Sequence, residues 1–170
     1  MKRLLYPLYI FLILVVMIPK ERLYFEFESL LSQHHLFINN ETFSNRLLTL
    51  EIENGELLLD NGVLGTLEHI HFTPWIVFNQ LSFENLSFSP LYRTFFPGNI
   101  DSIRMTYSLI HPLLVTIEGE GDFGHCSGAY DLMDEKIRIV FDPTPQLRRY
   151  PLLVGRLHQE KEGLVYESSF

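Results

Sequence analysis

The stretch LTLEIENGELLLDNG, residues 48–62, decides the fold class of this chain. Leucine and isoleucine alternate with polar residues on both sides of the pair Asn54-Gly55, and a second pair, Asn61-Gly62, follows. A period of two is typical of a strand that buries one face, and Asn-Gly between alternating runs is the strongest short-range signal for a hairpin. The sequence therefore predicts antiparallel strands joined by turns at both Asn-Gly pairs.

The alternation continues through most of the remaining chain. Pro74, Pro90 and the pair Pro97-Gly98 separate the alternating runs, as turn residues do. The further runs cover residues 67–72, 76–88, 103–109, 113–117, 126–132, 137–141 and 164–170. Short strands at nearly regular spacing favour an antiparallel meander over βαβ units, so we predict a mainly β domain.

Helical spacing replaces the alternation at both ends of this domain. Residues 20–37, KERLYFEFESLLSQHHLF, carry Leu23, Phe27 and Leu31 on one helical face, directly after Pro19. Residues 143–163 show the same spacing, with a kink expected at Pro151. We predict a short helix at each end of the sheet.

The first residues are apolar enough to cross a membrane. The run from Leu4 to Ile18 contains no charge and covers about 22 Å as a helix, and basic residues lie on both sides of it. We predict a transmembrane anchor over residues 1–19, with Leu4, Ile10, Leu14 and Ile18 in the bilayer. The alternatives are a cleaved signal peptide, although MIPKERLYF offers no small-residue cleavage site, and a buried core helix.

The predicted anchor also sets the expected location of the domain. Only three residues precede the apolar run, so we expect a cytoplasmic N-terminus in a bacterial inner membrane. Residues 20–170 then form a periplasmic β-rich domain, if the source is a Gram-negative bacterium.

Charge and cysteine content exclude several classes of protein. The formal net charge is −8, and four of the thirteen basic residues flank the apolar run, so the acidic excess lies in the domain. This composition excludes a nucleic-acid role, which needs clustered Lys and Arg. The single cysteine, Cys126, excludes an intramolecular disulfide and a cysteine-rich zinc cluster.

A few polar residues have the spacing of a site. Glu118, Glu120 and Asp122 alternate along GEGDFG and are predicted to project from one sheet face, as a divalent-cation or partner site or as a solvated strand face. His69 and His71 share a strand face, but no third ligand accompanies them. Phosphate-binding, nucleophile-elbow and zinc-helix motifs are absent, so we predict no catalytic residue, no cofactor and no metal.

The aromatic residues form the second candidate site. Between residues 72 and 88 the chain carries more aromatic side chains than one small core obviously needs: Phe72, Trp75, Phe78, Phe83 and Phe88. They are interpreted either as core packing or as the lining of a groove. Trp75 and Phe78 are the candidates for a ligand or partner surface.

Four stretches together resemble a known group of envelope proteins. They are PKERL at residues 19–23, LEIENGELLLDNG at 50–62, EGEGDFGHCSGAYDL at 118–132 and EGLVYE at 162–167. The pattern is similar to that of the type II secretion N-protein and AsmA-like proteins. The resemblance implies a membrane helix followed by a curved, groove-like antiparallel sheet, and the related lipopolysaccharide-export C protein holds lipid in such a groove.

Two functions follow from these expectations. The first is a non-enzymatic, membrane-anchored component of an envelope secretion or assembly system, which contacts partner proteins through sheet edges and its acidic face. The alternative is a carrier of lipid or another hydrophobic ligand in the β-groove.

Overall fold

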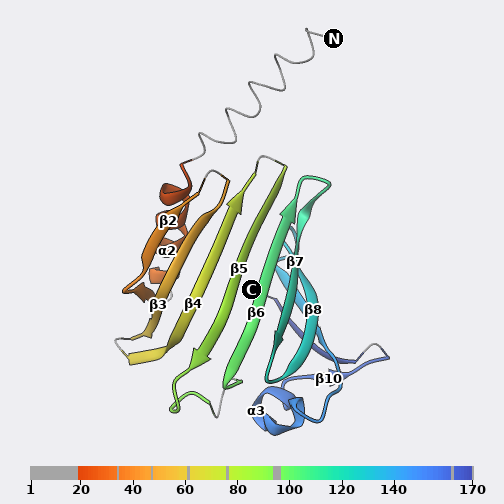
Figure 1. The fold of residues 1–170 in the computed structure, drawn as a ribbon. Helices are drawn as coiled ribbons and strands as arrows, with labels where there is room; N and C mark the ends of the chain where they lie inside the picture. Colours follow the sequence, from red (N-terminus) through yellow and green to blue (C-terminus); the bar gives the residue numbers. More distant parts are fainter. Residues whose placement is uncertain are drawn as a thin grey trace.

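The computed structural model describes residues 19–33, 35–46, 48–60, 62–75, 77–93, 97–161 and 163–169. They form one eleven-stranded antiparallel sheet with helical segments at both ends (Figure 1). The elements in chain order are α2 (Lys20–Gln33), β1 (Leu36–Asn39), β2 (Thr42–Asn45), β3 (Leu50–Leu59), β4 (Gly62–Pro74), β5 (Phe78–Phe88), β6 (Asn99–Ser108), β7 (His111–Gly121), β8 (Gly124–Asp131), β9 (Lys136–Phe141), the 3-10 helix η1 (Leu147–Arg149), α3 (Pro151–Val154), β10 (His158–Gln159) and β11 (Leu164–Ser169).

The strand order is that of a meander. Strands β3 to β9 are neighbours in chain order, followed by β11 and then β10. At the other edge, β2 pairs with the first half of β3 and β1 with its second half. Within the described part of the chain the sheet is open at both edges. The predicted antiparallel meander is confirmed.

The two faces of the sheet differ sharply in polarity. One in-register row across β3 to β6 is apolar and contains Ile52, Ile70, Phe83 and Ile103. We call this side the inner face, because the sheet bends until β8 and β10 lie behind β7 (Figure 1). The adjacent row on the outer face contains Glu51, His71, Ser82 and Arg104.

A line of irregularities crosses four strands and bends them. On each of β3 to β6, two successive inner residues are three positions apart where a regular strand would place them two apart: Ile52 and Gly55, Ile70 and Leu67, Phe83 and Leu86, Ile103 and Ile100. In the gaps, Asn54 and Asn85 have φ of 60° and 55°. The Asn85 side-chain amide donates to Glu68 at 2.6 Å. We call this line the kink.

The kink corrects one of the two predicted turns. Asn54-Gly55 lies inside β3, because the left-handed conformation that Asn54 adopts here serves a kink in a long strand. The backbone at Gly55 is closely packed, since an added Cβ would lie 3.1 Å from the Ile38 side chain. The second turn is confirmed: β3 ends at Leu59 and β4 begins at Gly62, with φ of 48° at Asp60.

Helix α2 covers the inner face near β1 and β4. It begins directly after Pro19, whose carbonyl accepts the Leu23 N–H at 3.1 Å, as the sequence predicts. Tyr24 is buried edge-on against Phe43, with ring centroids 5.4 Å apart, and its burial raises the pKa of its hydroxyl. Strands β1 and β2 were not predicted, because four residues are too few to show a period.

The C-terminal segment closes the opposite end of the sheet. Leu147 is fully buried, and its N–H donates to Thr144 Oγ1 at 3.3 Å, whose hydroxyl donates to the Phe123 carbonyl at 3.1 Å. The predicted helix is present as the short η1 and α3, separated at Pro151. The predicted last strand is present as β11.

The predicted anchor, with Leu4, Ile10, Leu14 and Ile18, lies outside the described residues. Among the helices that the structure does describe, none is long and apolar enough to cross a bilayer.

Asn54 offers a direct test of the kink. Replacing Asn54 with Val places a β-branched residue in left-handed backbone, which costs about 1–2 kcal/mol. We expect the Asn54→Val variant to lose roughly 3–6 °C of Tm, followed by circular dichroism in a mild detergent. Asn54→Gly is the control and keeps the wild-type Tm. An equal Tm in all three proteins would contradict a backbone requirement at this position.

Candidate functional site

The upper half of the inner face, over β6 to β9, carries a continuous apolar surface. Its members are in register from strand to strand: Tyr107 pairs with Val115, Val115 with Tyr130, and Tyr130 with Ile137. In the next row Met105 pairs with Ile117. We call these six residues the apolar inner surface: Met105, Tyr107, Val115, Ile117, Tyr130 and Ile137.

This surface lies apart from the main core. All six side chains are half-buried, and none of them is among the described residues that pack against the main hydrophobic cluster. Helix α2 packs mainly on β1 and β4, where Phe27 lies close to Phe72 and Leu81. Leu147 of η1 fills the opposite end of the inner face. The part of the inner face over β6 to β9 is thus left half-covered by the described part of the chain.

Glycines shape the strands beneath this surface. Gly128 faces Ile117 on one side and Ile139 on the other, and an added Cβ would collide with the Arg138 carbonyl oxygen. At Gly119 an added Cβ would lie 2.8 Å from the Cys126 sulfur. Only glycine allows strands β7 to β9 to approach so closely while they bend. Gly119 in GEGDFG and Gly128 in β8 therefore lie where neighbouring strands approach closely.

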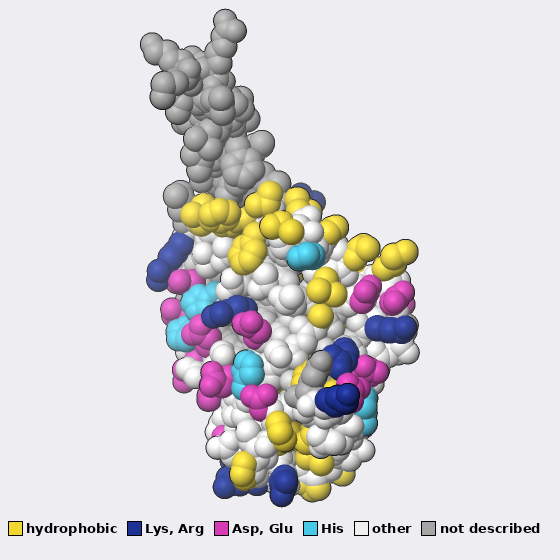
Figure 2. Space-filling view, turned by 90° about the vertical axis from the view of Figure 1, so that its right-hand side faces the viewer, with side chains coloured by type: hydrophobic (Ala, Val, Ile, Leu, Met, Phe, Trp, Pro, Cys, Tyr) yellow, Lys and Arg dark blue, Asp and Glu magenta, His cyan; other side chains and the backbone are white. Residues whose placement is uncertain are grey.

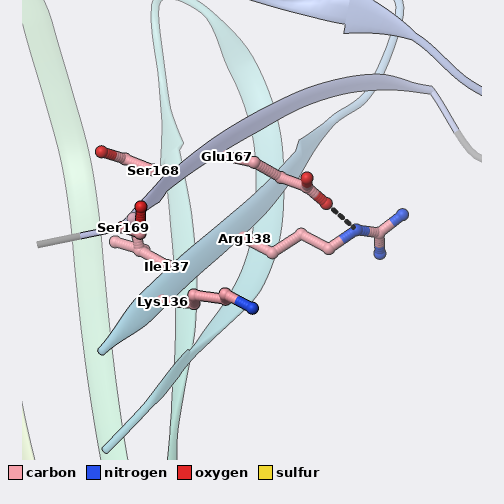
Figure 3. A pocket seen from close by; sticks show the side chains of 6 residues that line it. All are labelled: Lys136, Ile137, Arg138, Glu167, Ser168 and Ser169. Carbon is pink, nitrogen blue, oxygen red and sulfur yellow. Dashed lines mark hydrogen bonds and ion pairs between the residues drawn. The ribbon is translucent and has the colours of Figure 1, made fainter. Parts of the chain in front are cut away.

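An open pocket of about 430 Å³ lies at the β9–β11 end of the apolar row. Figure 3 shows Ile137 and Ser168 on one side of the two strands and Lys136, Arg138 and Glu167 on the other. Arg138 Nε donates to Glu167 Oε1 at 3.1 Å. The pocket therefore lies at a strand edge, with the end of the apolar inner surface on one face and charged side chains on the opposite face.

The same region holds a group with metal-ligand chemistry. His158, Glu160 and Glu167 have candidate ligand atoms within 4.8 Å of one another. Arg138 already binds both carboxylates, reaching Glu160 Oε2 at 2.7 Å. Hydrogen bonds from His158 and then Arg138 lower the pKa of Glu160. A cation would have to displace the guanidinium, so this group is an ion-pair cluster.

The predicted acidic residues do not form one row. Glu118 and Glu120 lie on the outer face of β7, and Glu118 is 4.0 Å from Arg104 Nη1. Glu118 also lines an open outer-face hollow of about 460 Å³. Asp122 lies in the β7–β8 turn, where its carboxylate accepts the Asn99 N–H at 2.9 Å. Its role there is to hold the end of β6.

The aromatic candidates separate into core and surface. Phe72, Phe83 and Phe88 belong to the inner face and pack in or against the core. Trp75 is exposed in the β4–β5 turn, and Phe78 starts β5 on the outer face, opposite Ser108. Neither of these two lines the apolar inner surface.

His69 and His71 share the outer face as expected. Their rings stack with centroids 6.0 Å apart, and His71 lies 3.7 Å from both Glu51 and Glu84. The acids flank the histidine from the two neighbouring strands. This arrangement is a cross-strand polar network on a solvated face.

Cys126 is buried on the inner face, and burial raises the pKa of its thiol to about 11. We therefore expect negligible reaction with a disulfide reagent at pH 8 in the folded protein, and full reaction in denaturant. Ser127→Cys in a Cys126→Ser background is the control: residue 127 is exposed on the outer face and reacts at once. Fast labelling of native Cys126 would contradict its core role.

No family model matches this sequence, and comparison with the curated proteins and with the solved structures gave no match either. The likeness to type II secretion N-proteins and AsmA-like proteins therefore stays a resemblance of sequence pattern. What the protein binds has to be inferred from its own residues, and the apolar inner surface is the feature that most needs a partner.

Proposed function

We propose that this domain binds the acyl chain of a lipid, or a similar elongated hydrophobic ligand, on its apolar inner surface. The observation that carries the proposal is a half-covered apolar face inside a bent sheet. Three strand spacings of about 4.8 Å make this surface about 14 Å wide from β6 to β9. Covering it with an apolar chain gains roughly 25 cal/mol per Å² of surface removed from water.

The pocket at Ile137 supports an amphipathic ligand in particular. It adjoins the apolar row at Ile137, and Ser168, which pairs with Ile137 on the same face, can hydrogen-bond to a polar headgroup. A chain lying along β6 to β9 would place its polar end there. Small-molecule sites commonly combine an apolar lining with a few polar groups of this kind.

The setting of this activity is part of the proposal. The charge-free run before Pro19 supports an inner-membrane anchor over residues 1–19, with residues 20–170 in the periplasm. The domain then binds its ligand without catalysing a reaction. Proximity to a bilayer would supply the lipid.

Adjacent residues on β6 provide the test. Met105→Gln keeps the side-chain length but places an amide on the inner surface, and Thr106→Gln places the same amide on the outer face. We expect Met105→Gln to lower the lipid retained per protein about tenfold, because it removes about 1.5 kcal/mol of apolar contact. The measurement is mass spectrometry of lipids in protein purified in a mild detergent.

Thr106→Gln should retain the wild-type amount of lipid, and both variants should keep the wild-type Tm. Lipid-free wild-type protein, or equal loss of lipid in both variants, would overturn the proposal.

A second candidate function is strand addition by a partner protein at the β11 edge. Strand β10 pairs only with Leu164 and Val165, so residues 166–169, which pair with β9 on one side, have no strand on their other side in the described part of the chain. An exposed strand edge is a ready site for another chain, which fits an envelope assembly component.

Photo-crosslinking from position 169 tests this candidate. In living cells we expect a discrete protein adduct from a photoreactive residue at Ser169, and none from Ser127, which is exposed on the outer face but central in the sheet. Equal labelling from both positions, or none from Ser169, would count against strand addition.

A further inference from the structure

Large apolar side chains gather at one end of the sheet. They occupy the three hairpin turns β4–β5, β6–β7 and β8–β9 together with the adjoining strand ends, all of which lie at the same end because the strands alternate in direction. Figure 2 shows hydrophobic side chains concentrated at the upper end of the molecule. We call these exposed residues the apolar rim: Trp75, Val77, Leu109, Ile110, Leu113, Leu132 and Met133.

Backbone hydrogen bonds join the three turns into one surface. The Leu109 N–H donates to the Val77 carbonyl at 3.0 Å, and the Leu132 N–H donates to the Leu113 carbonyl at 2.8 Å. Within the β8–β9 turn, Asp131 accepts the N–H of Met133 at 2.8 Å. The turns are therefore held together, and their apolar side chains are exposed.

The chain enters the domain at this same end. Lys20 Nζ donates to the Arg46 carbonyl at 2.6 Å, and the Arg46 N–H donates to the Thr49 carbonyl. Thr49 Oγ1 lies 3.2 Å from Thr73 Oγ1, two residues before Trp75. The charge-free sequence from Leu4 to Ile18 therefore joins the domain beside the rim.

The turns at the opposite end have a different character. The β3–β4 turn contains Asp60, and the β7–β8 turn contains Asp122 with Phe123 buried beneath it. Leu91 and Leu152 are exposed near that end, in separate segments. Among the described turns, apolar tips in three adjacent hairpins thus occur at the end where the apolar run enters.

We propose that the apolar rim rests in the headgroup–acyl boundary of a lipid bilayer, as a second membrane contact beside the anchor. Exposed apolar patches of this kind mark interaction sites, and tryptophan is enriched at membrane interfaces. A bilayer is the occupant that fits, because the apolar run and the rim meet at one end. Asp134 and Glu135 follow Met133 and keep the insertion shallow. The proposal does not depend on a lipid inside the sheet.

Trp75 is the only tryptophan of the chain and lies in the rim, so it reports on the contact. The full chain is reconstituted in phosphatidylcholine vesicles whose lipids carry bromine near the glycerol end of the acyl chains. We expect bromine to quench at least half of the Trp75 emission. Bromine near the chain end quenches less, and added anionic lipid does not increase the quenching.

Two double variants give the matched comparison. Ile110→Gln with Met133→Gln changes rim side chains that are 82% and 74% exposed, so it leaves the core intact. Leu91→Gln with Leu152→Gln makes the same change at the opposite end, at side chains 82% and 49% exposed. We expect the rim variant to lose at least half of the quenching and the control to lose none, with unchanged Tm in both.

Quenching that is absent in the wild type, or equal in rim and control variants, overturns the proposal. A concentration-dependent dimer with unquenched Trp75 would likewise overturn it and assign the rim to a second copy of the chain. Met105→Gln separates this proposal from the lipid-binding function. Quenching that persists in Met105→Gln comes from the rim, and quenching lost there comes from lipid on the inner surface.

Discussion

The structure depends on one constraint: a single-layer sheet must hide one face from water without a second sheet to cover it. The apolar rows that run through Ile52, Ile70 and Phe83 would be exposed on a flat sheet of this width. The chain meets the constraint by bending the sheet and by closing both ends of its inner face. Tyr24 of α2 and Leu147 of η1 are buried for this purpose. Over β6 to β9 the inner face stays half-covered, because neither α2 nor η1 reaches it. This part of the face is therefore the functional candidate.

The bending has two local causes, which differ in how clearly the sequence shows them. The glycines of GEGDFG alternate with acids, so the pattern drew attention to Glu118 and Glu120, although the close strand approach at Gly119 and Gly128 is the structural requirement. The kink could not be recognised from the sequence, for a different reason. Asn54 uses the same left-handed conformation in a strand that it would use in a turn, so local sequence alone does not separate the two. The pairing of β3 with β4 on both sides of Asn54 shows that the strand continues through this residue.

The mainly antiparallel sheet and the helices at both ends could be predicted, because hydrophobic period and turn residues are local signals. The candidate site could be predicted only in part. Periodicity places Met105 and Ile117 on one face of their strands, but whether that face is covered depends on where α2 and η1 pack. The same limit applies to Trp75 and Phe78. An aromatic excess was visible in the sequence, whereas its division between the core and the turns follows from three-dimensional arrangement.

The apolar inner surface and the apolar rim lie at the same end of the sheet, and this proximity has a physical consequence. Tyr107 lies two residues before Leu109, and Tyr130 lies two residues before Leu132. Residues of the inner surface are therefore followed directly along the chain by residues of the rim. If the rim lies in the bilayer boundary, an acyl chain could pass from the membrane to the inner surface while remaining in contact with apolar side chains. Such a path avoids exposing the chain to water, which is the main free-energy cost of moving a lipid. Ser168, paired with Ile137 at the start of β9, would then be positioned to receive the polar headgroup near the membrane surface.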